Sequence, residues 1–338
     1  MAAGKFFIIF MITDKTAAQA ELLFNRLTKR YRHLKKWARR IGTNAFRLYD
    51  RDIPEIPLIL DLYNDTVSGA LYKRPFEKDE AEEENWLLAM RESAARALGL
   101  KMSCIFLKTR QRMRQRQEAG IQYDKISGKS VYRDVIEGDL SFRVNVSDYV
   151  DTGLFPDARK KRAVIRSEAA GKSVLNLFAY TCSLSVCAAK GGAFQVDSVD
   201  LSNTYLDWGK VNFVLNGLNE GLGEQDKFGF IREDVSQFIS HAARKGKRWD
   251  LIILDPPSFS NSKKMKGTLD IRRDHRELIQ RCLSILSPKG TLYFSSNAKG
   301  FRLDDTDFPS YKIREITEKL RDEDFLGKKI PACYVFEE

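Results

Sequence analysis

The sequence predicts an α/β protein, in which a doubly wound, mostly parallel Rossmann-like sheet follows a smaller N-terminal α+β domain and a basic helical extension. Three observations predict this fold. Strand-like and helix-like segments alternate from residue 171 onward, whereas residues 46–150 contain short alternating runs separated by turn signals. Residues 1–45 are dominated by one amphipathic, basic helix. We therefore expect three parts, 1–45, 46–150 and 151–338, in a chain of 338 residues that is long enough for more than one core.

The first part is strongly basic. Residues 1–50 hold eleven Lys or Arg against three Asp or Glu, and the formal net charge of the whole chain is +11, which suggests a polyanionic partner. Apolar residues recur at helical spacing before a predicted stop at Gly42, namely Leu23, Leu27, Tyr31, Leu34, Ala38 and Ile41. The basic outer face of this helix is either simply solvated or in contact with phosphates. The candidate phosphate contacts are Arg30, Lys35, Lys36 and Arg39.

The second part is predicted to be a small α+β domain that contacts nucleic acid. An acid-rich start predicts a helix near residues 79–98. Lys108 begins a strict alternation of basic residues that includes Arg110, Arg112 and Arg114. If this stretch is extended, these side chains share one face, and if it is a loop the positive charge is merely dense. Either form can track a phosphate backbone. Residues 148–162 are expected to be the junction to the third part.

The third part shows the rhythm of a parallel sheet with crossover helices. Strands are expected at 173–178, 195–201, 228–231, 251–254 and 290–295, and helices at 183–190, 202–215, 235–245 and 274–286. The turn after the first strand lacks both G-x-G-x-x-G and G-x-x-x-x-G-K, so that cofactors with a pyrophosphate or triphosphate (NAD, FAD and ATP) are disfavoured.

Three acids follow three successive strands of this part, namely Asp200, Asp234 and Asp255. An acid at the first of these positions can accept hydrogen bonds from ribose hydroxyls, and one at the second from an adenine amino group. Together with the absent phosphate loop, this series predicts S-adenosylmethionine as the cofactor. The alternative is that each acid only caps a helix, a role for which Ser202, Ser236 and Asp274 compete.

Asp255 opens a rigid turn. Pro256 and Pro257 follow it and cannot continue a sheet ladder, so that a carboxylate is left at the carboxyl end of a strand, where ligands of open α/β sheets bind. Phe259 adds an aromatic face, and Asn261, Lys263 and Lys264 add polar and positive groups. This combination predicts a pocket for a planar, hydrogen-bonding ring such as a nucleobase, although an ordinary turn after a strand would look the same.

Several motifs of the chain resemble those of class I methyltransferases that act on 23S rRNA. They are Phe178-Ala-Tyr-Thr, Val199-Asp-Leu-Ser-Asn-Thr-Tyr-Leu-Asp-Trp, Asp255-Pro-Pro-Ser-Phe-Ser-Asn-Ser-Lys-Lys-Met, Arg273-Asp-His and Phe294-Ser-Ser-Asn-Ala-Lys-Gly-Phe-Arg-Leu-Asp. The resemblance covers nearly the whole chain and is greatest to the C-terminal, guanine-N7 half of the bifunctional bacterial 23S rRNA guanine methyltransferase, whose N-terminal half has no counterpart here. It implies a substrate of 23S rRNA or a large-subunit precursor, and a cofactor site made of Asn176, Phe178, Tyr180, Thr181, Asp200, Leu201, Ser202, Asp234 and Asp255. A dimer or a partner methyltransferase is left open.

One residue departs from the family pattern, which has Gly where this chain has Cys182. We expect the Cys182 side chain to lie where the methionine portion of the cofactor approaches the backbone.

The residues near the turn also bear on which atom is methylated. Cytosine C5 methylation needs a cysteine nucleophile, and none stands beside Asp255 or after the following strand. Guanine N7 carries a lone pair and no proton, so that alignment suffices. We expect Asp255, Pro256 and Pro257 to hold the base and Phe259 to stack on it. Polar contacts to the base or its phosphate are expected from Asn261, Lys263, Lys264, Asn297 and Lys299. An exocyclic amino group, cytosine C5, a nicotinamide-dependent oxidoreductase and a non-catalytic RNA-binding protein remain alternatives.

Cysteine and histidine usage predicts no metal site. The five cysteines show no Cys-x-x-Cys spacing and the three histidines are scattered, so that we expect neither a metal nor disulfides, and a cytoplasmic location. The apolar run of residues 6–12 is too short to span a bilayer, and we expect no membrane contact.

Overall fold

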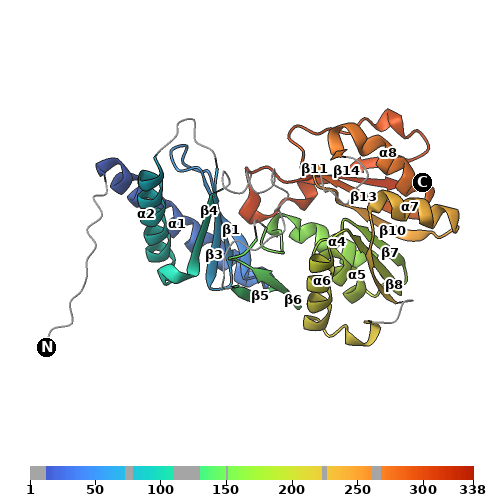
Figure 1. The fold of residues 1–338 in the computed structure, drawn as a ribbon, viewed down its shortest axis with the longest axis horizontal. Coiled ribbons are helices and arrows are strands. Elements are labelled where there is room, and N and C mark those ends of the chain that lie inside the picture. The colour runs from blue at the N-terminus through green and yellow to red at the C-terminus, as the bar shows by residue number, and fades with distance from the viewer. Residues whose placement is uncertain (1–12, 73–78, 110–129, 150, 223–226, 261–267) are drawn as a thin grey trace. The chain divides into compact units, whose positions relative to one another are not determined.

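The computed structural model describes residues 13–72, 79–109, 130–149, 151–222, 227–260 and 268–338 (Figure 1). Contacts within the chain divide it into two compact units. Unit 1 comprises Met1–Arg133 and Asn145–Thr152, and unit 2 comprises Asp134–Val144 and Gly153–Glu338. This division differs from the expected boundaries near residues 45 and 150, which stay a prediction about functional parts. No helix among the described residues is long and apolar enough to cross a membrane.

Among the described residues, unit 1 packs the helices α1 and α2 on a four-stranded sheet. The strands are β1 (Ala45–Asp50), β2 (Leu58–Tyr63), β3 (Thr66–Leu71) and β4 (Ile105–Thr109), in that order, and β3 and β4 pair in parallel. Parallel pairing requires a crossover, which α2 (Glu80–Leu98) provides. The helix α1 (Asp14–Ile41) lies beside α2, and both share a core with the sheet (Figure 1). The basic helix expected as an extension is therefore part of the core of unit 1.

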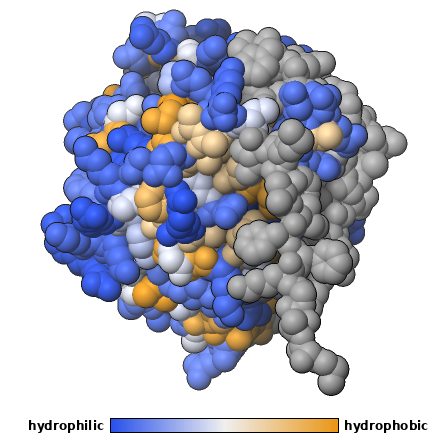
Figure 2. All heavy atoms as spheres, turned by 90° about the vertical axis from the view of Figure 1, so that its left-hand side faces the viewer, coloured by the Kyte–Doolittle hydropathy of each residue, from blue (hydrophilic) through white to orange (hydrophobic). Residues whose placement is uncertain are grey.

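Helix α1 ends at the predicted residue but begins earlier than its apolar pattern. Thr13 caps the N-terminus by accepting from the backbone N–H of Thr16, and Gly42 ends the helix at φ +74°. The first turns of α1 bury the polar side chains of Thr16 and Gln19. Burial of Gln19 is tolerated because its side-chain carbonyl accepts a hydrogen bond from the indole of Trp86 (2.6 Å). A search for apolar periodicity cannot find such turns. The side of the molecule that holds α1 and α2 in Figure 1 is mostly hydrophilic (Figure 2).

Unit 2 is built on a seven-stranded sheet with the order β14-β15-β13-β10-β7-β8-β9. The five strands from β13 to β9 are parallel, and β15 is antiparallel to both of its neighbours. The predicted doubly wound, mostly parallel sheet is thus confirmed. The bounds are β7 (Ser173–Leu177), β8 (Gln195–Asp200), β9 (Phe228–Arg232), β10 (Trp249–Leu254), β13 (Leu286–Ser296), β14 (Lys312–Glu315) and β15 (Ala332–Glu337). The sequence pattern did not predict β14 and β15. Two further sheets in the described part of the chain have two strands each. One pairs β11 (Phe259–Ser260) with β12 (Leu269–Asp270), and the other pairs β5 (Tyr132–Glu137) with β6 (Leu140–Asn145).

Helices cover both faces of the large sheet. On one face, α7 (Val235–Arg244) and α8 (Ile271–Ser284) share a core with Leu177, Leu254 and Phe294. On the other lie α4 (Arg159–Glu168), α5 (Ser183–Lys190) and α6 (Asn203–Leu215) (Figure 1). Side chains alternate between the faces of a strand, so that Asn176 and Ser295 point toward α4, α5 and α6.

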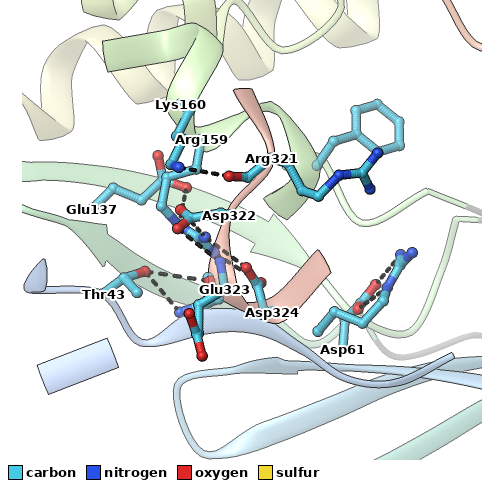
Figure 3. A network of polar contacts seen from close by, with 12 residues as sticks. Thr43, Asp61, Glu137, Arg159, Lys160, Arg321, Asp322, Glu323 and Asp324 are labelled. Carbon is cyan, nitrogen blue, oxygen red and sulfur yellow. Dashed lines mark hydrogen bonds and ion pairs between the residues drawn. The ribbon is translucent and has the colours of Figure 1, made fainter. Parts of the chain in front are cut away.

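Helix α4 lies where the sequence predicted only a junction. It carries buried cations that pair with acids from distant parts of unit 2. Arg159 donates to Asp322 (2.9 Å) and Asp324 (3.1 Å), and Lys160 donates to the carbonyl of Arg321 (2.6 Å), as Figure 3 shows. Arg162 donates to Glu137 (2.7 Å). The sequence was interpreted only as a junction here, and Arg159, Lys161 and Arg162 can be buried because each of these charges meets an acidic partner.

Candidate cofactor and base-binding site

Three neighbouring strands bring two of the three predicted acids, Asp200 and Asp255, to the carboxyl edge of the sheet. Leu177 of β7 pairs with Val199 of β8 on one side and with Leu254 of β10 on the other. The next residues along these strands are Phe178, Asp200 and Asp255. The strand order reverses between β7 and β10, and open α/β sheets bind their ligands at such a point.

The turn after β7 is held in an uncommon backbone conformation. Phe178, Tyr180 and Cys182 all have positive φ, at 57°, 50° and 59°, which non-glycine residues adopt only when their surroundings hold them there. Thr181 Oγ1 donates to the carbonyl of Gly153 (2.5 Å), and the Tyr180 N–H donates to Asp200 Oδ2 (2.9 Å). The turn is therefore fastened both to β8 and to the segment before α4.

Asp200 keeps hydrogen-bonding capacity after these contacts. Its Oδ1 accepts from the N–H of Ser202 (2.9 Å), and burial raises the pKa of the carboxyl above 3.8, against the effect of the backbone N–H donors. A carboxylate offers about four acceptor positions, so that acceptor positions remain for a hydroxyl pair. The acid at the end of β8 therefore fits a ribose, as S-adenosylmethionine requires.

The side chain of Cys182 is directed into the interior of unit 2. Its side chain is fully buried and packs on α6, where a Cβ added to Gly209 would lie 2.4 Å from the sulfur. Burial raises the pKa of this thiol to about 12. The absence of a side chain at Gly209 makes room for the sulfur in the interior, and the expectation that the cofactor approaches the backbone at Cys182 stays a prediction.

Other predicted cofactor residues have local partners. Asn176 points into the interior and donates to Ser185 Oγ (2.8 Å), while its Oδ1 has no hydrogen-bond partner within the described chain. Asp234 caps α7 by accepting from the N–H of Gln237 (3.1 Å), and Ser202 caps α6. Asp270 rather than Asp274 caps α8. Of the predicted acids, Asp234 thus serves as a helix cap, whereas Asp200 does not. The remaining predicted residue, Leu201, is half-buried.

An aromatic group beside the turn was missed in the sequence. The ring of Tyr180 stacks on Phe155, with centroids 5.5 Å apart, and meets Tyr205 edge-on at 4.5 Å. The Phe155 side chain is 45% exposed although it is large and apolar. Its position in the chain, just before α4, carries no signal of this role, because the contact spans 25 residues.

Asp255 lies at the end of β10 with a partner that the sequence did not reveal. Lys161 of α4 donates to its Oδ2 (2.7 Å), and the Asp255 side chain remains 36% exposed. Both following peptide bonds are trans, Pro256 is buried and Pro257 is exposed. The Phe259 side chain is 59% exposed on β11, where it can meet a flat ring.

The buried thiols of unit 2 are poor nucleophiles. Cys333 of β15 lies 3.7 Å from Ser295 Oγ, near the Asp255 turn, but burial raises the pKa of its thiol to about 11. Cys187 and Cys282 are also buried, and burial raises the pKa of both thiols, that of Cys187 to about 12. Within the described ranges, no group of three His, Cys, Asp or Glu side chains could hold a metal ion.

The predicted RNA contacts fall into three groups. Lys35, Lys36 and Arg39 are exposed on α1, and Arg30 is half-buried and donates to the carbonyl of Leu48. Asn297 and Lys299 are exposed after β13. Five further candidates, together with Asn261, lie outside the described residues, namely Arg110, Arg112, Arg114, Lys263 and Lys264.

Comparison with known proteins agrees with this geometry. A model of the S-adenosylmethionine-dependent methyltransferase family matches residues 49–318. The chain is 45% identical over 311 residues to the ribosomal RNA large subunit methyltransferase K of Neisseria meningitidis, covering 92% of this chain and 85% of that protein. It is 42% identical over 308 residues to the ribosomal RNA large subunit methyltransferase K/L of Pseudomonas putida. The second match covers 90% of the chain but 40% of the relative, so that the chain spans less than half the length of that protein.

Solved structures share the fold. A methyltransferase complexed with SAH has a TM-score of 0.71 at 24% identity, covering 94% of this chain and 82% of that one. A SAM-dependent methyltransferase from Streptococcus mutans has a TM-score of 0.67 at 24% identity, covering 94% and 81%.

Cofactor binding is expected to weaken in acid because of Asp200. Burial raises the pKa of this carboxyl, and its protonation removes an acceptor from the ribose hydroxyls. Calorimetric titration with S-adenosylhomocysteine between pH 8 and pH 4.5 should show affinity that is constant near neutrality and falls at a pH above the ordinary Asp range. Asp200→Asn should bind about 10- to 100-fold more weakly, with little dependence on pH over this range. Asp207→Asn, at an exposed position of α6, is the matched control and should follow the unmodified protein. Unchanged affinity in Asp200→Asn would contradict the assignment.

Proposed function

Because the chain belongs to the S-adenosylmethionine-dependent methyltransferase family, we propose that it methylates the 23S rRNA of the large ribosomal subunit, or its precursor, at guanine N7. The observation that carries the rRNA substrate is the 45% identity, over 92% of the chain, to a protein named as a ribosomal RNA large subunit methyltransferase. Such a substrate also implies that the enzyme works in the cytoplasm.

The carboxyl edge of β7, β8 and β10 would hold the cofactor. Asp200 would accept from the ribose hydroxyls, and Asp234 from the adenine amino group through the capacity that its capping bond leaves. The turn of Phe178, Tyr180 and Thr181 would line the site. S-adenosylmethionine supplies an electrophilic methyl group on a sulfonium sulfur.

The residues around Asp255 suit a nucleophile that carries its own lone pair. Guanine N7 needs no base to remove a proton and no thiolate to activate the ring. The buried thiols of Cys282 and Cys333, whose pKa values are raised by burial, are not suited to act as such a thiolate. The task left to the protein is to hold the base in line, which is worth several kcal/mol in well-oriented reactions. Asp255 and the two rigid prolines would hold its edge, and exposed Phe259 would stack on its face.

Helix α1 would provide a contact surface for the rRNA backbone. Residues 26–40 contain eight Lys or Arg and no Asp or Glu, and most of these basic side chains are exposed. Attraction between such a surface and phosphates does not depend on base sequence, so that it favours binding while the base site selects the nucleotide.

Mapping of rRNA nucleosides tests the proposed reaction. Mass analysis of 23S rRNA from cells with and without the gene should show one 7-methylguanosine that is lost with the gene and restored by the intact gene but not by an Asp255→Ala variant. Loss of an N2-methylated guanine or a 5-methylcytosine instead would disprove N7 while leaving an rRNA methyltransferase. An unchanged 23S rRNA would contradict the substrate as well.

The role of α1 is tested by removing three exposed charges. The triple variant Lys35→Ala, Lys36→Ala and Arg39→Ala should bind a 23S rRNA fragment about 10- to 100-fold more weakly near 0.1 M salt. The slope of log affinity against log salt concentration should become shallower by an amount that corresponds to roughly two lost phosphate contacts. Its affinity for S-adenosylhomocysteine should not change.

The matched control changes the same number of exposed charges on another helix end, at Arg244, Lys245 and Lys247. Equal losses in the two triple variants would indicate general charge attraction and contradict a specific surface on α1.

A further inference from the structure

Lys161 is the one lysine of α4 whose ammonium reaches the carboxyl edge of the sheet. Its side chain is 5% exposed, and its Nζ lies 2.7 Å from Asp255 Oδ2 and 3.0 Å from Ser295 Oγ. Asp255 follows β10 and Ser295 belongs to β13, so that the ammonium bridges two neighbouring strands at the place where the base site is proposed.

The hydroxyl of Ser295 is the second hydrogen-bond partner of the Lys161 ammonium. It donates toward the sulfur of Cys333 (3.7 Å), which leaves its oxygen to accept from Lys161. An ammonium taken out of water requires a counter-charge, and among the described residues Asp255 is the acid that pairs with it. The contact therefore fixes which oxygen of Asp255 faces inward.

The two oxygens of Asp255 are thereby made different. Oδ2 is engaged by Lys161, whereas Oδ1 accepts no hydrogen bond from the described part of the chain although the side chain is 36% exposed. An N–H group of a base edge can use such an acceptor. The rotamer that presents it is set by an ion pair on a rigid helix instead of by a loop, which is how a binding group is held to within about half an ångström.

We infer that Lys161 is a positioning residue for methyl transfer, which holds Asp255 by Oδ2 so that Oδ1 receives the target base. This inference rests on the proposed function and deepens it. With its carboxylate engaged by a buried ammonium, Asp255 serves as a hydrogen-bond acceptor and not as the group that takes a proton from the nucleophile. The site is thereby suited to a ring nitrogen that offers a lone pair. The N–C bond would form as the S–C bond of the sulfonium breaks and its electron pair goes to the sulfur, which leaves S-adenosylhomocysteine, and no proton leaves the base.

A double-mutant cycle tests the inference. Lys161→Met keeps the unbranched, apolar part of the side chain and removes the ammonium group. Single-turnover methyl transfer to 23S rRNA, at saturating cofactor and RNA, should slow about 100-fold, as expected when a positioned group shifts by roughly 1 Å. Asp255→Asn should slow the reaction similarly, and the double variant should be no slower than Asp255→Asn alone, because Lys161 acts through Asp255.

Two controls separate positioning from a structural role. Lys160→Met removes the neighbouring charge of α4, whose Nζ contacts the carbonyl of Arg321, and should transfer methyl groups at the normal rate. Affinity for S-adenosylhomocysteine and the thermal midpoint are measured for every variant, and both should stay near normal in Lys161→Met. Ser295→Ala removes the second contact of Lys161 without touching Asp255 and should give a smaller loss, about tenfold or less.

Three outcomes would overturn the inference. In the first, Lys161→Met loses stability and cofactor affinity to an extent that accounts for its slower transfer, while Ser295→Ala reacts at the normal rate. Lys161 would then be a structural residue. An equal effect of Lys161→Met in the Asp255→Asn background would mean that it does not act through Asp255. A normal rate in Lys161→Met would remove its role. If the methylated product is not 7-methylguanosine, the proposed function fails, but the coupling between Lys161 and Asp255 is read from rates and is judged separately.

Discussion

The buried cations of α4 constrain the arrangement of unit 2. Arg159, Lys161 and Arg162 are all less than 10% exposed, and a buried charge is tolerated only when it is paired and hydrogen-bonded. Arg159 pairs with Asp324 near the C-terminus, Lys161 with Asp255, and Arg162 with Glu137 of β5. One helix of ten residues therefore pairs with a terminal segment, with the Asp-Pro-Pro turn and with a hairpin strand. Figure 3 shows the first of these contacts, between Arg159 and the acids Asp322 and Asp324.

This constraint explains how the two acids of the proposed site are oriented by contacts within unit 2. Asp255 is oriented by α4, and Asp200 is oriented by the backbone N–H groups of Tyr180 and Ser202. The turn between them keeps three residues at positive φ because Thr181 and Tyr180 fasten it on two sides. Both acids are thus set before any ligand arrives, which lowers the cost of ordering them on binding.

The alternation of strands and helices was sufficient to predict the parallel sheet, and with it the convergence of Asp200 and Asp255, because parallel strands bring their carboxyl ends to one edge. The role of Asn176 in the cofactor site stays a prediction, and the sequence did not reveal that the period of two along β7 turns its side chain toward α5. Lys161 could not be predicted, because a basic run is ordinarily solvated and its partner is 94 residues away. The same holds for Cys182, whose sulfur is accommodated by the missing side chain of Gly209 on another helix.

The most direct test is a crystal structure of the protein with S-adenosylhomocysteine and a 23S rRNA fragment that contains the methylated nucleotide. We predict that both ribose hydroxyls lie within hydrogen-bond distance of Asp200. We also predict that a guanine N–H reaches Asp255 Oδ1, while Lys161 stays paired with Oδ2. A cofactor ribose bound away from Asp200, or a target base held without contact to Asp255, would contradict the account.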